Sequence, residues 1–133
     1  MQFSVAVRNA RLDAIETTTG ASAILYMRSG AAPANCAAAD TGTVLATVNL
    51  PADWMAAAAA GSKAMSGTWQ DAAADATGVA AHFRIKDSTG TTCHMQGTVT
   101  ATGGGGDMTV DNTSFAVGQN FTITGFTLTD GNA

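Results

Sequence analysis

The chain has 133 residues, a formal net charge of −4, and 46% hydrophobic but only 12% charged residues. This charged share is about half of the usual one, which disfavours a free, highly soluble cytosolic enzyme and favours a protein whose surface is covered by partners. The lysines and arginines are dispersed singly and form no basic patch, so we expect no nucleic-acid partner. A chain of this length is expected to form one domain over residues 1–133.

The start of the chain argues against export and membrane insertion. Arg8, Arg11 and Asp13 lie where a secretory signal peptide needs an apolar run. No segment approaches the roughly 18 consecutive apolar residues of a membrane span. We therefore expect a protein that is made in a cytoplasm, stays soluble there at first, and has no membrane partner.

Residues 3–17 are the best candidate for an α-helix, with Ser4 suited to cap its start and Gly20 to close its end. One apolar stripe at the helical spacing consists of Phe3, Val7, Ala10 and Ala14. Val5 and Leu12 lie on the opposite side. A short helix that is apolar on two sides is either enclosed within its own domain or in contact with a neighbour, and internal burial is the first expectation.

The following segments are typical of short strands separated by turns. Residues 23–27 form a short apolar run, and residues 43–50 alternate between two faces. The alanine-rich segment 53–67 fits either a short helix at 53–60 or a hairpin that turns at residues 61–62. The β-rich surroundings favour the hairpin.

The segment HFRIKDSTGTTCHMQGTVT predicts a β-hairpin in which apolar residues pair on one side of the sheet. We expect Ile85 to pair with Cys93 and Phe83 with Met95. This register places Cys93 on the core face. The connecting loop is then short and ends at Gly90, which is free to adopt a left-handed conformation.

The end of the chain carries two further signals. Residues 102–107 are glycine-rich, and we interpret them as a flexible hairpin connection. In residues 121–130 the apolar positions change from odd to even numbers at Gly125, which indicates a β-bulge. With about six to eight short strands after one helix, the sequence predicts a mainly β fold, an antiparallel β-sandwich with one N-terminal α-helix.

The sequence offers little material for catalysis. The histidines are His82 and His94, and the predicted register places both on the polar, exposed face of one hairpin. A catalytic nucleophile needs a base and a group that orients it, whereas this chain has a single glutamate, Glu16, and no hydrolase or zinc-protease motif. The glycine run 103–106 lacks the Lys-Ser/Thr pair and the helix of a P-loop. We therefore expect no enzyme, no cofactor and no small-molecule substrate.

Cys36 and Cys93 are the only cysteines, and their spacing does not match the close ligand pairs of structural zinc sites. Neighbours on a strand point to opposite faces, so Cys93 and His94 do not converge on one ion and we expect no metal. Cys36 lies in a loop that can fold across Cys93, which leaves a disulfide or two buried free thiols. A disulfide that closes so long a loop stabilises by up to about 4 kcal/mol.

A family resemblance is carried by FSVAVRNARLDAIE (3–16), RSGAAPA (28–34), ADTGTVLATVNLP (39–51), DATGVAAHFRIKDSTGTT (75–92) and NTSFAVGQNFTITGFTLTDG (112–131). Together these stretches resemble a family of small virion structural proteins encoded by tailed bacteriophages. The resemblance covers essentially the whole chain and specifies a fold and a lineage but no chemistry. It implies a component of the virion that is assembled in the cytoplasm of the host bacterium.

Within this class we favour a capsid decoration (cement) protein, which bridges neighbouring capsid subunits and opposes the internal pressure of the DNA. The implied partners are the major capsid protein and copies of the protein itself, with a homotrimer at threefold positions suggested by analogy. The candidate contact residues are Phe3, Val5, Leu12, Trp54 and Met55. Each of them is equally suited to the core of its own domain.

Two alternatives stay open at this point. A tail or baseplate accessory protein, such as a fibre-associated sandwich, would share the sequence features and differ in copy number. A carbohydrate-binding module for host recognition would need an exposed aromatic platform, for which the chain offers Trp54, Trp69 and Tyr26.

Overall fold

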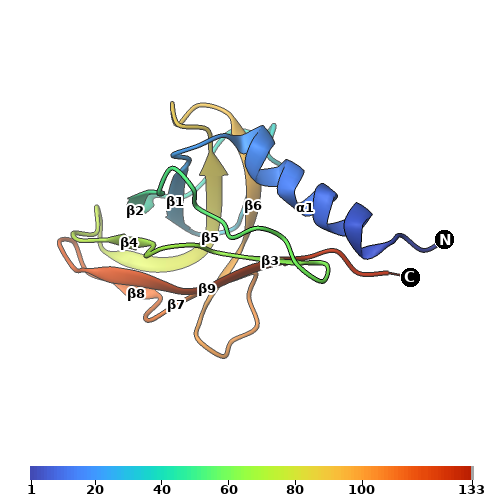
Figure 1. Ribbon diagram of the computed structural model, residues 1–133. Helices are drawn as coiled ribbons and strands as arrows, with labels where there is room; N and C mark the ends of the chain where they lie inside the picture. Colours follow the sequence, from blue (N-terminus) through green and yellow to red (C-terminus); the bar gives the residue numbers. More distant parts are fainter. Residues whose placement is uncertain (133) are drawn as a thin grey trace.

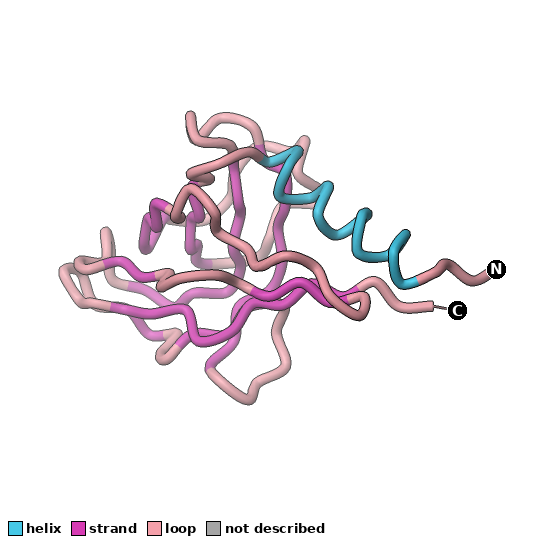
Figure 2. Tube along the Cα trace, viewed as in Figure 1, coloured by secondary structure: helices cyan, strands magenta, loops and turns pink. Residues whose placement is uncertain are grey.

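The computed structural model describes residues 1–132, and within that range it contains one helix and nine strands (Figures 1 and 2). The helix is α1 (Val5–Thr19). The strands are β1 (Ile24–Ser29), β2 (Val44–Asn49), β3 (Ser62–Ala64), β4 (Gln70–Asp71), β5 (Gly78–Lys86), β6 (Cys93–Ala101), β7 (Met108–Val110), β8 (Ser114–Phe115) and β9 (Phe121–Thr129). The prediction of a mainly β fold with one N-terminal helix is confirmed.

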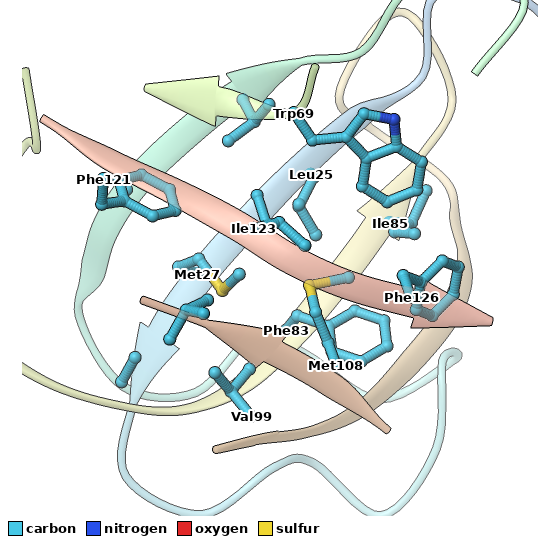
Figure 3. Packing of buried hydrophobic residues seen from close by; sticks show 14 of the residues in the cluster. Leu25, Met27, Trp69, Phe83, Ile85, Val99, Met108, Phe121, Ile123 and Phe126 are labelled. Atoms are coloured by element: carbon cyan, nitrogen blue, oxygen red, sulfur yellow. The ribbon is translucent and has the colours of Figure 1, made fainter. Parts of the chain in front are cut away.

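The strands form one curled sheet in the order β2-β1-β5-β6-β7-β9-β3, with β8 paired to β5 and β4 paired to β9. Figure 3 shows β9 crossing over β1 and β5, with apolar side chains filling the space between them. This arrangement is sandwich-like, as predicted. The pairing is mixed rather than purely antiparallel, because β6 and β7 run parallel.

The glycine-rich loop between β6 and β7 is the reason for the parallel pair, and its interpretation as a hairpin connection is wrong. The loop folds back against β6, where Gly106 N–H donates to Thr100 Oγ1 at 3.0 Å. The Asp107 carboxylate accepts from the Thr98 N–H at 2.8 Å and from the Thr98 hydroxyl at 2.7 Å. A Cβ added at Gly104 would lie 2.7 Å from Thr100 Cβ, so the chain approaches β6 this closely only because the side chain is missing.

The two layers of the curled sheet meet through aromatic rings in the core. Phe83 on β5 and Phe126 on β9 pack edge to face, with ring centroids 5.6 Å apart (Figure 3). Trp69 lies 5.5 Å from Phe126, and Trp54 lies 5.9 Å from Trp69. Both tryptophans are fully buried, and each indole N–H donates to a backbone carbonyl. The aromatic chain therefore joins the layers and leaves no polar indole group unpaired.

The segment 53–67 forms the hairpin that the sequence favoured, with its turn one residue earlier than the predicted 61–62. Ala59 and Ser62 exchange backbone hydrogen bonds at 2.8 and 2.9 Å. The turn lies at Ala60 and Gly61, whose φ values are +53° and +77°. Two successive positive φ values are the geometry of the tight turns that match the twist of paired strands.

The predicted β-bulge at Gly125 is also confirmed. Thr109 pairs with Gly125, whereas Val110 pairs with Ile123, so the register shifts by one residue between the two pairs. In a regular strand Ile123 and Phe126 would face opposite sides, because one has an odd and the other an even position. The extra residue of the bulge allows both side chains to point into the core.

Both end strands of the sheet are partly covered by neighbouring chain. On β2, Leu45 C=O accepts from Asp75 N–H at 2.8 Å. On β3, Ala64 C=O accepts from Ala56 N–H at 2.9 Å. This covering leaves less of each edge to pair with a strand of another molecule.

Candidate interaction surface and cysteine site

Helix α1 is attached to the sheet by polar side chains on its inner face. The contacts are Arg8 Nη1 to Asp130 O at 2.8 Å, Gly61 N–H to Asn9 Oδ1 at 2.9 Å, Ala58 N–H to Asp13 Oδ1 at 3.0 Å and Met55 N–H to Glu16 Oε1 at 3.0 Å. Asn9, Asp13 and Glu16 accept from N–H groups of the 53–67 hairpin that would otherwise lack partners, and Arg8 donates to the C-terminal segment. Leu12, at 4% exposure, is the large apolar side chain that this face buries.

A buried lysine fixes the helix on the hairpin. Lys63 Nζ lies 2.7 Å from Asp13 Oδ1, 3.0 Å from Glu16 Oε2 and 2.9 Å from Ala56 O. Burial alone would lower the pKa of Lys63, but the hydrogen bonds that its ammonium group donates to the two carboxylates outweigh burial and raise that pKa. The same hydrogen bond from Lys63 lowers the pKa of Asp13. The helix is thus held in one position by a charged cluster rather than by an apolar seam.

The apolar stripe of α1 faces solvent, which reverses the first expectation of internal burial. Phe3 is 41% and Val7 is 44% exposed, and Ala10 and Ala14 are exposed as well. Val5, in the first turn, is 48% exposed. Val5 lies on the opposite side of the helix from the stripe, so the name exposed helix surface is given to Phe3, Val7, Ala10 and Ala14 alone. Figures 1 and 2 show that the N-terminal part of α1 extends beyond the sheet, so this surface lies at the margin of the molecule.

The candidate contact residues separate into two groups. Phe3 and Val5 are accessible to a partner. Leu12, Trp54 and Met55 are buried in the protein's own interior, so the expectation that they contact a partner is corrected for these three. Val7, Ala10 and Ala14 also belong to the surface, although they are not among the predicted contacts, because helical spacing identifies an apolar stripe and not the side that it faces.

A shallow hollow of about 280 Å³ adjoins the exposed helix surface. Its lining residues are Arg11, Ala14, Ile15, Thr18, Thr19 and His94. Ala14 belongs to both the hollow and the surface, so the two are continuous. His94 is exposed, as predicted, and offers a polar group at the rim of an otherwise weakly charged region.

On the other side of the sheet, residues 30–43 form a loop that we call the strap. The strap covers the outer face of β1, β5 and β6, and Ser29 N–H donates to Thr43 O at 3.1 Å where its two ends meet. Gln96 Nε2 donates to Pro33 O at 2.7 Å. His82 Nδ1 lies 2.9 Å from Gly30 O, and His82 is buried. The prediction of an exposed His82 is therefore wrong, because the strap covers the face on which it lies.

Arg84, at 1% exposure, is the main anchor of the strap. Its guanidinium donates to Asp40 Oδ1 at 2.5 Å and to the carbonyl oxygens of Cys36, Ala38 and Asn35 at 2.7, 3.1 and 3.3 Å. Asp40 also accepts from Arg28 Nη2 and Lys86 Nζ, each at 2.8 Å. Burial would raise the pKa of Asp40, but the three cations outweigh burial and lower it.

The strap brings the two cysteines together. Cys36 Sγ lies 2.7 Å from Cys93 Sγ, and both residues are half-buried free cysteines. Arg84 Nε donates to Cys93 Sγ at 3.3 Å. Burial, together with the neighbouring Cys93, raises the pKa of the Cys36 thiol to about 11. The loop that carries Cys36 thus lies across Cys93, in agreement with the expectation from the sequence.

The face that carries Cys93 differs from the prediction. Ile85 pairs with Met95, and Cys93 pairs with Lys86, with a register shift between the two pairs. His94 is the additional residue of this bulge. Cys93 therefore lies on the outer face beside Arg84 instead of on the core face, and the predicted pairing of Ile85 with Cys93 is wrong.

Comparison with protein-family models, with curated proteins and with solved structures found no match. Among residues 1–132, no helix is long and apolar enough to cross a membrane. The geometry offers two regions with a possible role: an apolar surface that can bind a partner, and a pair of thiols that can be oxidised.

Proposed function

We propose that the protein is a structural component of a bacteriophage virion, and more narrowly a capsid decoration (cement) protein that binds the major capsid protein and stabilises the shell. The observation that carries this proposal is the exposed helix surface. It presents Val7, Ala10 and Ala14 on one side of α1, with Phe3 just before the helix, at the margin of a protein with few charges. The proposal also rests on the resemblance of the sequence to small virion proteins.

Burial of this surface supplies the affinity. Removing apolar area from water stabilises a complex by about 25 cal/mol per Å². A helix already fixed by the Lys63 cluster loses little further freedom on binding, so less of that gain is lost. A decoration protein binds many equivalent positions on a lattice, and contacts between its own copies, in a trimer for instance, multiply a weak single contact.

The first test is the copy number of the protein in phage particles. Particles from the culture that yields this gene are purified on a gradient, and the protein is quantified by mass spectrometry relative to the major capsid protein. A ratio comparable to that of the capsid protein is the expected result. A few copies per particle would move the protein to the tail or baseplate and overturn the cement role, and its absence would overturn the virion role.

A matched pair of variants tests the surface itself. Val7→Glu places a charge on the exposed helix surface, whereas Val117→Glu makes the same change at a valine that is 66% exposed in the loop after β8. Figure 1 shows β8 on the opposite side of the molecule from α1. We expect Val7→Glu to abolish binding to undecorated capsids and Val117→Glu to leave it intact. Equal binding by both variants would exclude α1 as the contact.

The structure gives less support to a carbohydrate-binding module. Such a module needs aromatic rings on its surface, and Trp54 and Trp69 are fully buried. Tyr26 is half-buried, with Arg28 and Lys86 within 5.9 and 5.6 Å of its ring centre. None of the three rings presents an open face for a sugar, and a glycan array is expected to show no binding.

A further inference from the structure

We propose that Cys36 and Cys93 form an intramolecular disulfide that locks the strap onto the outer face of β1, β5 and β6. The sulfur atoms lie 2.7 Å apart although the residues are 57 positions apart in sequence. The separation approaches that of a covalent S–S bond, about 2.05 Å. A small adjustment of the strap therefore suffices for bond formation.

The strap needs such a lock because its other attachments are almost entirely polar. Most of its residues are exposed, and Pro33 is its one buried residue among residues 30–43, all of which the structure describes. Several of its polar contacts converge on Arg84 and Asp40, and others join Gln96 to Pro33 and His82 to Gly30. Such noncovalent contacts can open together in a local fluctuation, whereas a covalent bond between the middle of the strap and β6 stays closed.

The oxidation requires a two-electron acceptor, and a low-molecular-weight disulfide such as oxidised glutathione suits the half-buried sulfurs. One cysteine loses its proton and attacks a glutathione sulfur, forming a mixed disulfide and releasing one glutathione thiolate. The second cysteine, also deprotonated, attacks the protein sulfur of that mixed disulfide and releases the second glutathione. Two electrons pass to glutathione, and the two thiol protons end on its thiols.

The high pKa of the Cys36 thiol, about 11, affects the rate and not the outcome of this reaction. Only the thiolate attacks a disulfide, so a thiol that stays protonated at neutral pH reacts slowly. We expect the rate of oxidation to increase as the pH rises from 7 to about 9. The rate should increase with pH for any disulfide oxidant, because each of them is attacked by the thiolate. A protein that is made reduced in a cytoplasm would thus become locked after transfer to an oxidising medium.

The experiment uses the purified full chain and is independent of any capsid partner, so its failure and the failure of the proposed function are distinguishable. The reduced protein is incubated with oxidised glutathione, denatured, alkylated and weighed by mass spectrometry. We expect two alkyl groups before oxidation and none afterwards, with a peptide that links residues 36 and 93. Two reactive thiols after oxidation, a persistent glutathione adduct or a link between two chains would overturn the proposal.

Two further readouts test the lock. The oxidised protein is expected to melt about 10 °C higher than the reduced protein. The control is the double variant Cys36→Ser/Cys93→Ser, which we expect to melt at the same temperature with and without oxidant. If the double variant folds poorly, Cys36→Ser alone serves as the control, with the same expected result. Amide hydrogens of the strap should exchange more slowly after oxidation, while those of the hairpin at residues 59–62 should not change. Unchanged exchange in the strap would refute the lock.

Discussion

Arg84 Nη1 and Asp40 Oδ1 lie 2.5 Å apart across 44 positions of sequence, and this ion pair holds the strap against β5. The guanidinium is enclosed and also donates to backbone carbonyls of the strap. A buried arginine is tolerated here because each of its nitrogens finds an acceptor.

Replacing Arg84 should therefore be costly. Arg84→Met keeps the volume of the side-chain stem but removes all of its donors, and it leaves Asp40 with Arg28 and Lys86 alone. We expect the free energy of unfolding, measured by urea denaturation, to fall by about 3 to 5 kcal/mol. Arg11→Met is the control, because it removes a single ion pair, to Asp130, from a side chain that is 55% exposed, and it should cost clearly less than Arg84→Met. Equal losses would contradict the anchoring role of Arg84.

Stability should decrease in acid. In the folded protein the hydrogen bond from Lys63 lowers the pKa of Asp13, and the backbone and hydroxyl of Thr98 lower the pKa of Asp107, each from an ordinary value of 3.8. A carboxyl with a depressed pKa contributes its stability above the unfolded value and loses it as the pH falls through the folded value. We expect a constant free energy of unfolding above about pH 5 and a decline below pH 4, measured by denaturation at each pH.

A variant identifies the source of this pH dependence. Asp107→Asn should lower stability at neutral pH and make the decline in acid shallower, because one titrating group has been removed. Asp53→Asn, at an exposed position, should leave the acid profile unchanged. An identical profile for wild type and Asp107→Asn would contradict the assignment.

The turn of the 53–67 hairpin holds Ala60 in a strained backbone conformation that a glycine would relieve. Ala60 has a φ of +53°, a conformation that glycine adopts at lower cost than alanine. Ala60→Gly should therefore raise the free energy of unfolding by up to about 1 kcal/mol in thermal or urea denaturation. Gly61→Ala should do the opposite, because φ is +77° and the new Cβ would lie 2.6 Å from Arg8 Nη1. A loss of stability in Ala60→Gly would show that the turn is not strained.

The two sides of α1 should respond differently to truncation. Leu12→Ala removes a side chain that is 4% exposed and should cost about 2 to 4 kcal/mol in urea denaturation. Val7→Ala acts on a side chain that is 44% exposed and should change stability by less than about 0.5 kcal/mol. Similar effects of the two substitutions would mean that the exposed helix surface is in fact part of the core.

Local signals were sufficient for several elements of the fold. Ser4 and Gly20 cap α1 as predicted, since Ser4 Oγ accepts from Val7 N–H and Gly20 N–H donates to Glu16 O. The hairpin around Ala60 and the bulge at Gly125 also follow from nearby residues. Caps, tight turns and changes of alternation depend on a few neighbouring residues, so one sequence is enough to find them.

Features that depend on distant segments could not be predicted in the same way. The polar contacts on the inner face of α1 could not be predicted, because their partners are backbone N–H groups of the 53–67 hairpin. The position of a backbone group leaves no pattern of side chains in the sequence. The face of Cys93 was missed because the bulge at His94 shifts the register by one residue. In the sequence Arg84 looks like an ordinary polar residue on the exposed face of a strand. It is buried because the distant strap covers it and accepts its hydrogen bonds.

The contact between the chain ends has a consequence for how the protein can be rebuilt. The Asn132 side chain accepts from the Phe3 N–H at 2.9 Å and donates to the Phe3 carbonyl at 3.0 Å, so segments near the two ends of the described residues meet (Figure 2). A short linker could join them, with new ends opened in the exposed loop between β5 and β6. Such a circular permutant would keep every pairing of the sheet, and peptides fused to its new ends would project away from the site where the old ends meet.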